Sequence, residues 1–109
     1  MKALCIQEPW ATMIAEGKKT IETRTWRTNY RGRILLVASK KPAGKYSGHA
    51  FAVATIVAVH PMQEHEVQAA CCPRYKHAMS WVLSDVKPLA NPFPVKGKLS
   101  LFEVPINQP

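Results

Sequence analysis

The sequence GKKTIETRTWRTNYRG, residues 17–32, combines five basic side chains and two large aromatic ones with a single acid, Glu22. Between Lys19 and Trp26 it alternates with a period of two residues, which predicts a strand. Glu22 and Arg24 would then project from the same face, about 7 Å apart along the strand, close enough for their side chains to meet. Flat aromatic faces among cations favour a ligand that carries bases or phosphates.

Two interpretations of this strand stay open. In the simpler interpretation, Glu22 and Arg24 form an ordinary surface ion pair, which is worth at most about 1 kcal/mol. In the other, Glu22 holds the Arg24 guanidinium for a ligand or accepts hydrogen bonds from a base edge. Lys19 then contacts a phosphate or a carbonyl oxygen of the same ligand.

Upstream of this stretch, residues 2–7 predict a short apolar strand, and Pro9 predicts the first turn of a helix. Gly17 suits a left-handed cap at the end of that helix. The apolar stripe of the helix consists of Trp10, Met13 and Ile14. Because Trp10 belongs to this stripe, we expect its ring to be half buried in the core, and one ring face is a candidate for stacking on a ligand.

Downstream, residues 27–32 predict a turn, and the apolar run at 33–39 predicts a central strand buried on both faces. Residues 40–48 predict a basic loop, which either clamps a nucleic-acid backbone or is simply solvated. The remaining elements are expected to be a strand at 51–60, a short helix at 64–72, a strand at 80–89, a proline-rich turn at 91–94 and a strand at 99–104.

Five or six short strands, one early helix and one minor helix predict an α+β fold built on a small, mostly antiparallel β-barrel. The chain has 109 residues, of which 47% are apolar and 20% charged, as is typical of one globular domain covering residues 1–109. No apolar run is long enough to span a membrane, and the first residues lack the hydrophobic segment of a secretion signal. We therefore expect a cytoplasmic monomer.

The charge of the chain favours a polyanionic partner. Its formal net charge is +8, and most of its basic residues fall between Lys18 and Lys45. Such a balance attracts nucleic acid through the summed field and the release of counterions. The alternative is a domain that binds other proteins and whose basic face only keeps it in solution.

The cysteines and histidines predict neither a disulfide nor a metal site. Cys5, Cys71 and Cys72 are expected to be reduced, because adjacent cysteines do not readily form an unstrained disulfide. Cys71 and Cys72 lie near His65 and His77, but no Cys-x-x-Cys or His-x-x-x-His spacing is present. The chain also lacks the motifs of phosphate loops, serine hydrolases and zinc proteases, and no cofactor is expected.

Residues 17–24, Gly-Lys-Lys-Thr-Ile-Glu-Thr-Arg, resemble the Gly-x-Lys-x-x-Glu-x-Arg signature of the ASCH domain family. The resemblance continues over nearly the whole chain. The segments that agree are Pro9-Trp10-Ala11, Arg31-Gly32-Arg33-Ile34-Leu35-Leu36, Ala38-Ser39-Lys40, Trp81-Val82-Leu83 and Pro92-Phe93-Pro94-Val95-Lys96-Gly97-Lys98.

The resemblance implies a PUA-like β-barrel with a cleft between the first helix and the barrel, lined by Lys19, Glu22 and Arg24 and used on RNA or its nucleosides. Similar domains include RNA-binding modules of coactivator proteins, a ribonuclease and an enzyme that deacetylates N4-acetylcytidine. That enzyme uses a lysine, which Lys19 matches, and a threonine three residues later, where this chain has Glu22. The nucleophile proposed for the deacetylase is therefore missing here.

We expect the chain to bind RNA, another single-stranded nucleic acid or a modified nucleoside. Stacking is expected from the aromatic side chains and phosphate contacts from the basic ones. The residues expected to contact the ligand are Trp10, Lys18, Trp26, Arg27, Tyr30, Arg31, Ser39, Lys40 and Lys41. The alternative is a hydrolase, in which Glu22 is the general base, Lys19 stabilises the oxyanion and Arg24 orients the substrate.

Overall fold

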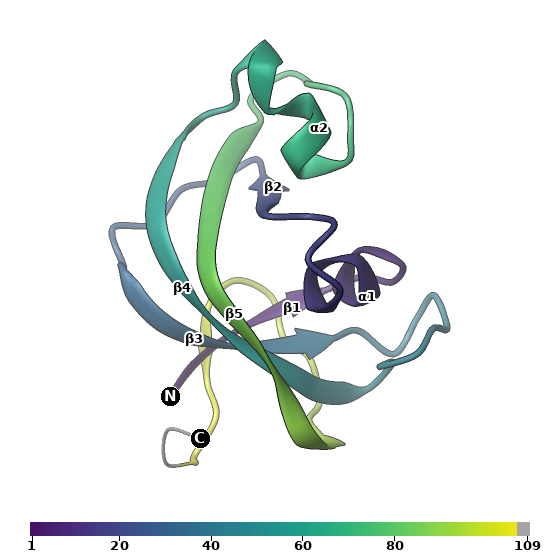
Figure 1. Cartoon of the computed structure of the whole chain (residues 1–109). Helices are drawn as coiled ribbons and strands as arrows, with labels where there is room; N and C mark the ends of the chain where they lie inside the picture. The colour runs from purple at the N-terminus through teal and green to yellow at the C-terminus, as the bar shows by residue number, and fades with distance from the viewer. Residues whose placement is uncertain (107–109) are drawn as a thin grey trace.

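One six-stranded sheet, two short helices and a 3-10 turn make up the structure, a computed structural model that describes residues 1–106 (Figure 1). In chain order the elements are β1 (Lys2–Ile6), α1 (Trp10–Ala15), β2 (Ile21–Arg24), β3 (Gly32–Ala38), β4 (His49–Pro61), the 3-10 turn (Glu64–Glu66), α2 (Val67–Ala70), β5 (Met79–Pro94) and β6 (Phe102–Glu103). The strand order is β2-β5-β4-β3-β1-β6, and among the described residues only β1 and β3 pair in parallel. The predicted α+β fold with a mostly antiparallel sheet is therefore confirmed.

The sheet is strongly curled but not closed. β4 and β5 are thirteen and sixteen residues long and curve around the side on which α1 lies (Figure 1). Their pairing register shifts at three places, and such irregularities bend a sheet. Within residues 1–106 the edge strands β2 and β6 do not pair with each other, so the prediction of a closed barrel is wrong. These two edge strands have only four and two residues.

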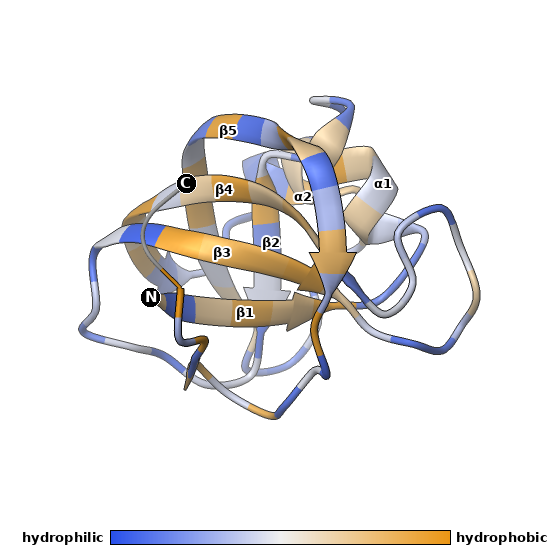
Figure 2. Ribbon diagram, turned by 90° about the horizontal axis from the view of Figure 1, so that it is seen from below, coloured by the Kyte–Doolittle hydropathy of each residue, from blue (hydrophilic) through white to orange (hydrophobic). Residues whose placement is uncertain are grey.

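The core lies on both faces of β3. Ile34 and Leu36 pack with α1 and Trp81 on the concave side, whereas Leu35 and Val37 pack with Val53 on the other. Figure 2 shows the hydrophobic residues that continue along β3 and β1. The prediction that residues 33–39 form a central strand buried on both faces is confirmed.

The last third of the chain differs most from expectation. β5 continues without interruption through residues 91–94, where the sequence predicts a turn, and Phe93 pairs with Ala50 of β4. Prolines are accommodated because β2 pairs with β5 only from Met79 to Val82. Beyond that point one side of β5 is a sheet edge, where a missing N–H breaks no ladder. The strand expected at 99–104 is reduced to Phe102–Glu103.

The buried carboxylate of Glu66 fixes the short helical segment before α2. Its Oε1 accepts hydrogen bonds from the Ser80 hydroxyl at 3.0 Å and the Gln63 backbone N–H at 2.9 Å, and its Oε2 lies 2.8 Å from His60 Nε2. Burial raises the pKa of Glu66. The bonds from Gln63, His60 and Ser80, together with the charge of His60, outweigh burial and hold the pKa below its ordinary value of 4.5.

Glu66→Gln is expected to lower the free energy of unfolding by about 1–2 kcal/mol at neutral pH. Because the pKa is lowered in the folded state, the carboxylate stabilises the fold above about pH 4.5, and this contribution is lost as the pH falls through the folded pKa. Urea unfolding of both proteins from neutral pH down to about pH 3 should give stabilities that converge in acid. A difference that stays constant over this range would contradict the role of the charge.

In the part of the chain that the structure describes, no helix combines the length and the apolar character needed to cross a membrane.

Candidate functional site

A cavity of about 1420 Å³ opens between α1, β2, the loop that follows β3 and residues 94–100. The residues predicted for the site that line it are Trp10, Lys19, Glu22, Arg24, Trp26, Ser39 and Lys40. Lys18, Arg27, Tyr30, Arg31 and Lys41 do not line it. The structure therefore brings together the signature residues of β2 and part of the expected surroundings, and leaves most of the basic turn outside.

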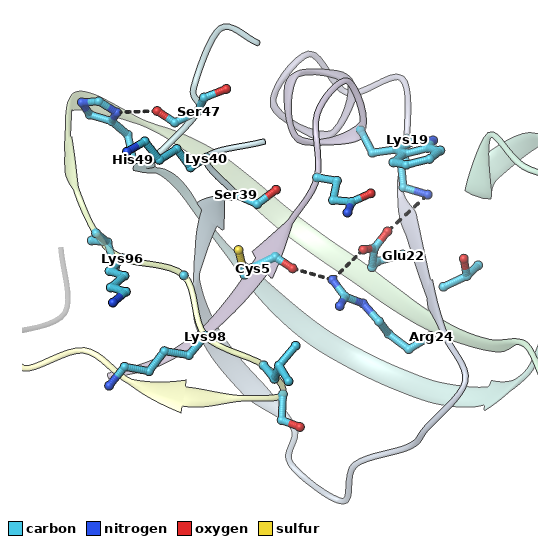
Figure 3. A pocket seen from close by; sticks show the side chains of 18 of the residues that line it. Cys5, Lys19, Glu22, Arg24, Ser39, Lys40, Ser47, His49, Lys96 and Lys98 are labelled. Carbon is cyan, nitrogen blue, oxygen red and sulfur yellow. Dashed lines mark hydrogen bonds and ion pairs between the residues drawn. The ribbon is translucent and has the colours of Figure 1, made fainter. Parts of the chain in front are cut away.

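Three charged side chains form a connected network at the floor of the cavity (Figure 3). Glu22 Oε1 lies 3.5 Å from Lys19 Nζ, and Glu22 Oε2 accepts a hydrogen bond from Arg24 Nη2 at 2.8 Å. Lys19 is 2% exposed and Glu22 8% exposed. The alternative of an ordinary surface ion pair is therefore wrong, because the central carboxylate and one of its two cations are buried.

Backbone contacts place this network. Gly17 adopts the left-handed conformation expected of it, with φ at +79°, and lets the chain turn away from α1. Lys19 then donates from its backbone N–H to the carbonyl oxygen of Met13 and from its Nζ to the backbone carbonyl oxygen of Ala70 at the end of α2. The Lys19 side chain is thereby fixed between α1 and α2.

Alternation along β2 directs neighbouring side chains differently, but not as completely as predicted, because Thr23 lines the cavity together with Glu22 and Arg24. Ile21 packs into the cluster around α2 with Met62 and Ala70. Thr23 also points toward the α2 region, where its hydroxyl lies 3.7 Å from Cys72 Sγ. Arg24 points the other way and donates to the backbone carbonyl oxygen of Cys5 at 2.6 Å, so that β2 is connected to β1 across the concave side.

Arg24 has unused hydrogen-bonding capacity. Its Nη2 serves both Glu22 and Cys5, whereas its Nε is buried and has no hydrogen-bond partner within residues 1–106. A buried donor without a partner costs about 1–3 kcal/mol.

The three aromatic residues predicted to stack on a ligand have different surroundings. Trp10 lines the cavity and is 36% exposed. Trp26 also lines the cavity but packs edge-on against Trp81, with ring centroids 4.7 Å apart. Tyr30 lies outside the cavity, packs against the core and donates its hydroxyl to the carbonyl oxygen of Arg33. Trp10 is therefore the ring best placed for stacking, and Tyr30 is a structural residue.

The basic side chains outside the cavity have partners close by in the chain, or lie on a segment that leads away from the cavity. Lys18 lies 3.2 Å from the carboxylate of Glu16. Arg31 donates to the carbonyl oxygens of Thr28 and Tyr30. The turn that carries Arg31 connects β2 to the start of β3, and this path does not return to the cavity.

The loop between β3 and β4 is held in place by a buried acid that sequence reasoning overlooked. Glu8 accepts hydrogen bonds from the backbone N–H groups of Thr12 in α1 and Tyr46 in the loop, at 2.8 and 2.9 Å. A methyl group at Gly44 would lie 2.5 Å from Glu8 Cγ, so only glycine permits this approach. The loop is therefore fixed to α1, and it brings Lys40 to the rim of the cavity.

Several other lining residues were not predicted. They include Cys5, Ser47, His49, Cys72, Tyr75, Lys96 and Lys98. Burial raises the pKa of the Cys5 thiol, which the nearby Arg24 charge partly opposes. The only sequence signal for any of them is the Lys96-Gly97-Lys98 pattern, a glycine between two cations in a segment that belongs to the family resemblance.

Residues 1–106 contain no cluster of three or more His, Cys, Asp or Glu side chains placed to hold an ion. The three cysteines are free thiols.

Comparison with known proteins places the chain among relatives of known fold. A sequence model of the ASCH domain matches residues 4–93. Over 41 residues the chain is 42% identical to activating signal cointegrator 1 of Homo sapiens; the match covers 37% of this chain and only 7% of that much longer protein.

The fold is similar to that of ASCH from Zymomonas mobilis, with a TM-score of 0.73, 17% identity and coverage of 94% of this chain and 86% of that chain. A crystal structure of a mutant of that protein gives a TM-score of 0.61 at 19% identity, covering 87% and 72% of the two chains. At such low identity these likenesses concern the fold alone.

Proposed function

We propose that this chain, which belongs to the ASCH domain family, binds single-stranded RNA in the cavity between α1 and the curled sheet. One base would enter the cavity, meet the Lys19–Glu22–Arg24 network at its floor and stack on Trp10. The partner class is the one that the family resemblance implies, and the basic character of the chain suits a polyanion.

The observation that carries this proposal is the buried network of Lys19, Glu22 and Arg24 in the lining of the cavity. A base edge presents donors and acceptors side by side, and a ligand pocket reads such an edge with a few convergent polar groups. The partly exposed guanidinium of Arg24 lines the cavity, and the Glu22 carboxylate has more lone pairs than its two cations use. Burial of Lys19 and Glu22 keeps water from competing at the floor.

Trp10→Ala is expected to weaken binding of a short, fluorescently labelled single-stranded RNA by about tenfold, because one stacked base is worth about 1–3 kcal/mol. Fluorescence anisotropy measures the affinity, and circular dichroism verifies that the variant is folded. Trp10→Phe is the matched control, since it retains a ring and should retain most of the affinity.

Two results would contradict the proposal. One is the absence of saturable RNA binding by the unchanged protein at low salt. The other is an equal affinity of the Trp10→Ala variant and the unchanged protein, which would place the RNA elsewhere on the surface.

A hydrolase acting on RNA or on N4-acetylcytidine is the second candidate, and the short distance between Lys19 and Glu22 inside the cavity is the observation that favours it. Both oxygens of Glu22 already face cations, which suits orientation of a ligand better than proton abstraction. Incubation with each substrate and separation of the products distinguishes the two candidates. Intact RNA and N4-acetylcytidine support binding alone, whereas a product that disappears in folded Glu22→Gln supports hydrolysis.

A further inference from the structure

We infer that Lys40, Lys96 and Lys98, which we call the lysine wall, bind a phosphate group of the ligand whose base meets the network at the floor. The ligand of the cavity is then a nucleotide unit, with the base at one side and its phosphate at the other. This inference rests on the proposed function and adds the phosphate as a second group of the ligand that the cavity recognises.

The charges of the lysine wall are not neutralised by the protein. Within residues 1–106, no carboxylate lies within 4.0 Å of any of the three ammonium groups. Among these described residues, Glu22 is the only acid that lines the cavity, and both of its oxygens are engaged by Lys19 and Arg24. Several cations elsewhere do have a carboxylate partner, namely Lys2, Lys18, Arg33, Arg74 and Lys87. The lysine wall is thus a patch of positive charge without internal compensation.

The lysine wall and the network lie on different sides of one cavity. In Figure 3, Lys19, Glu22 and Arg24 come from one side, and Lys96 and Lys98 come from the opposite side, with Cys5 and Ser39 between them. The cavity of about 1420 Å³ exceeds the roughly 300–1,000 Å³ of ordinary small-molecule pockets. It has room for a base, a sugar and a phosphate together.

The backbone that carries Lys96 and Lys98 is fixed before any ligand arrives. Val95 donates its N–H to the carbonyl oxygen of Gly48, in the loop that Glu8 anchors. Gly97 lies flat against Cys5, since a methyl group there would come within 2.5 Å of Cys5 Sγ. Contacts with both the loop before β4 and with β1 hold this segment, so less backbone entropy is lost when a phosphate binds.

The chemistry of the lysine wall suits phosphate of more than one kind. An ammonium group is a compact charge with three donors that rotate freely, so it makes fewer geometric demands than the planar fork of arginine. The three lysines therefore suit either the phosphomonoester of a free nucleotide or the phosphodiester of a strand. The shared chemistry is a phosphate attached to a nucleoside.

Calorimetric titration tests this inference with four probes: ribonucleosides, their 5′-monophosphates, inorganic phosphate and a short single-stranded RNA. We expect at least one monophosphate to bind about tenfold more tightly than its nucleoside, because hydrogen bonds to charged groups contribute more than neutral ones. The double variant Lys96→Gln/Lys98→Gln should lose this advantage and keep the nucleoside affinity. Its RNA affinity should also depend less on salt, by about 0.7 in log–log slope for each phosphate that the variant no longer binds.

The double variant Lys76→Gln/Lys87→Gln is the matched control, because it removes the same charge from two exposed lysines outside this cavity. It should leave every affinity nearly unchanged.

Tighter binding of the monophosphate than of its nucleoside supports a free nucleotide as the source of the phosphate. Tighter binding of RNA alone supports a strand as the source. Either result supports the inference.

The inference would be overturned if nucleosides and phosphorylated ligands bound with equal affinity. It would also be overturned if the two double variants lost equal affinity for the phosphorylated ligands. RNA would still bind and still respond to Trp10→Ala in both cases, so the proposed function would stand. No binding of RNA or nucleoside to the unchanged protein would overturn both.

Discussion

Glu22→Gln is expected to lower the free energy of unfolding by about 3–5 kcal/mol, because it removes the carboxylate that pairs with the buried Lys19 and the partly buried Arg24. Lys19 is 2% exposed and would retain only the carbonyl oxygen of Ala70 as a partner. The glutamine amide has nearly the same shape as the carboxylate, so the loss measures charge and not packing. Urea unfolding followed by tryptophan fluorescence gives the free energy.

Glu16→Gln is the matched control for this change. Glu16 faces Lys18 at 3.2 Å, but both side chains are about half exposed or more, and such a pair is worth at most about 1 kcal/mol. Adding Lys19→Met to Glu22→Gln should recover part of the loss, since one of the two uncompensated charges then disappears. A loss for Glu22→Gln as small as that of Glu16→Gln would show that water reaches the network.

Local patterns of the sequence account for the elements that form the floor of the cavity. The apolar run at 33–39 predicts β3, and the alternation after Lys19 correctly places Glu22 and Arg24 on one face, where they meet at 2.8 Å. Gly17 correctly marks the turn out of α1. These features depend on side chains a few residues apart, which periodicity and capping rules describe well.

Features that depend on distant parts of the chain escaped prediction. The Lys19 ammonium contacts a carbonyl oxygen 51 residues later, and the basic turn around Arg31 leads away from the cavity although it is close in sequence. Lys96 and Lys98 line the cavity on either side of Gly97, which packs against Cys5 near the other end of the chain. Which strands become the edges of the sheet depends on pairing across the whole chain, and no local pattern determines it.

Trp81→Ala is expected to lower the free energy of unfolding by about 3–5 kcal/mol, the usual cost of removing a fully buried tryptophan. Trp81 has the largest side chain among those that are fully buried, and it packs with Ile34, Ile56 and other core residues on the concave side of the sheet. It also stands opposite Glu22 in the pairing of β2 with β5, and its indole N–H donates to the carbonyl oxygen of Trp26 at 3.2 Å. Because cross-strand partners project to the same face, the space left by this side chain would lie beside Glu22.

Trp10→Ala is the control for Trp81→Ala, because Trp10 is the same residue type but 36% exposed on α1. It should cost less than about 1 kcal/mol in stability while weakening RNA binding, whereas Trp81→Ala should reduce stability first and alter binding through the displaced Trp26 ring. Trp81→Phe separates the two parts of the Trp81 contribution: it keeps an aromatic ring against Trp26 but loses the hydrogen bond, and it should cost about 1–3 kcal/mol. Equal stabilities of Trp81→Ala and Trp10→Ala would mean that Trp81 does not stabilise the concave side of the sheet.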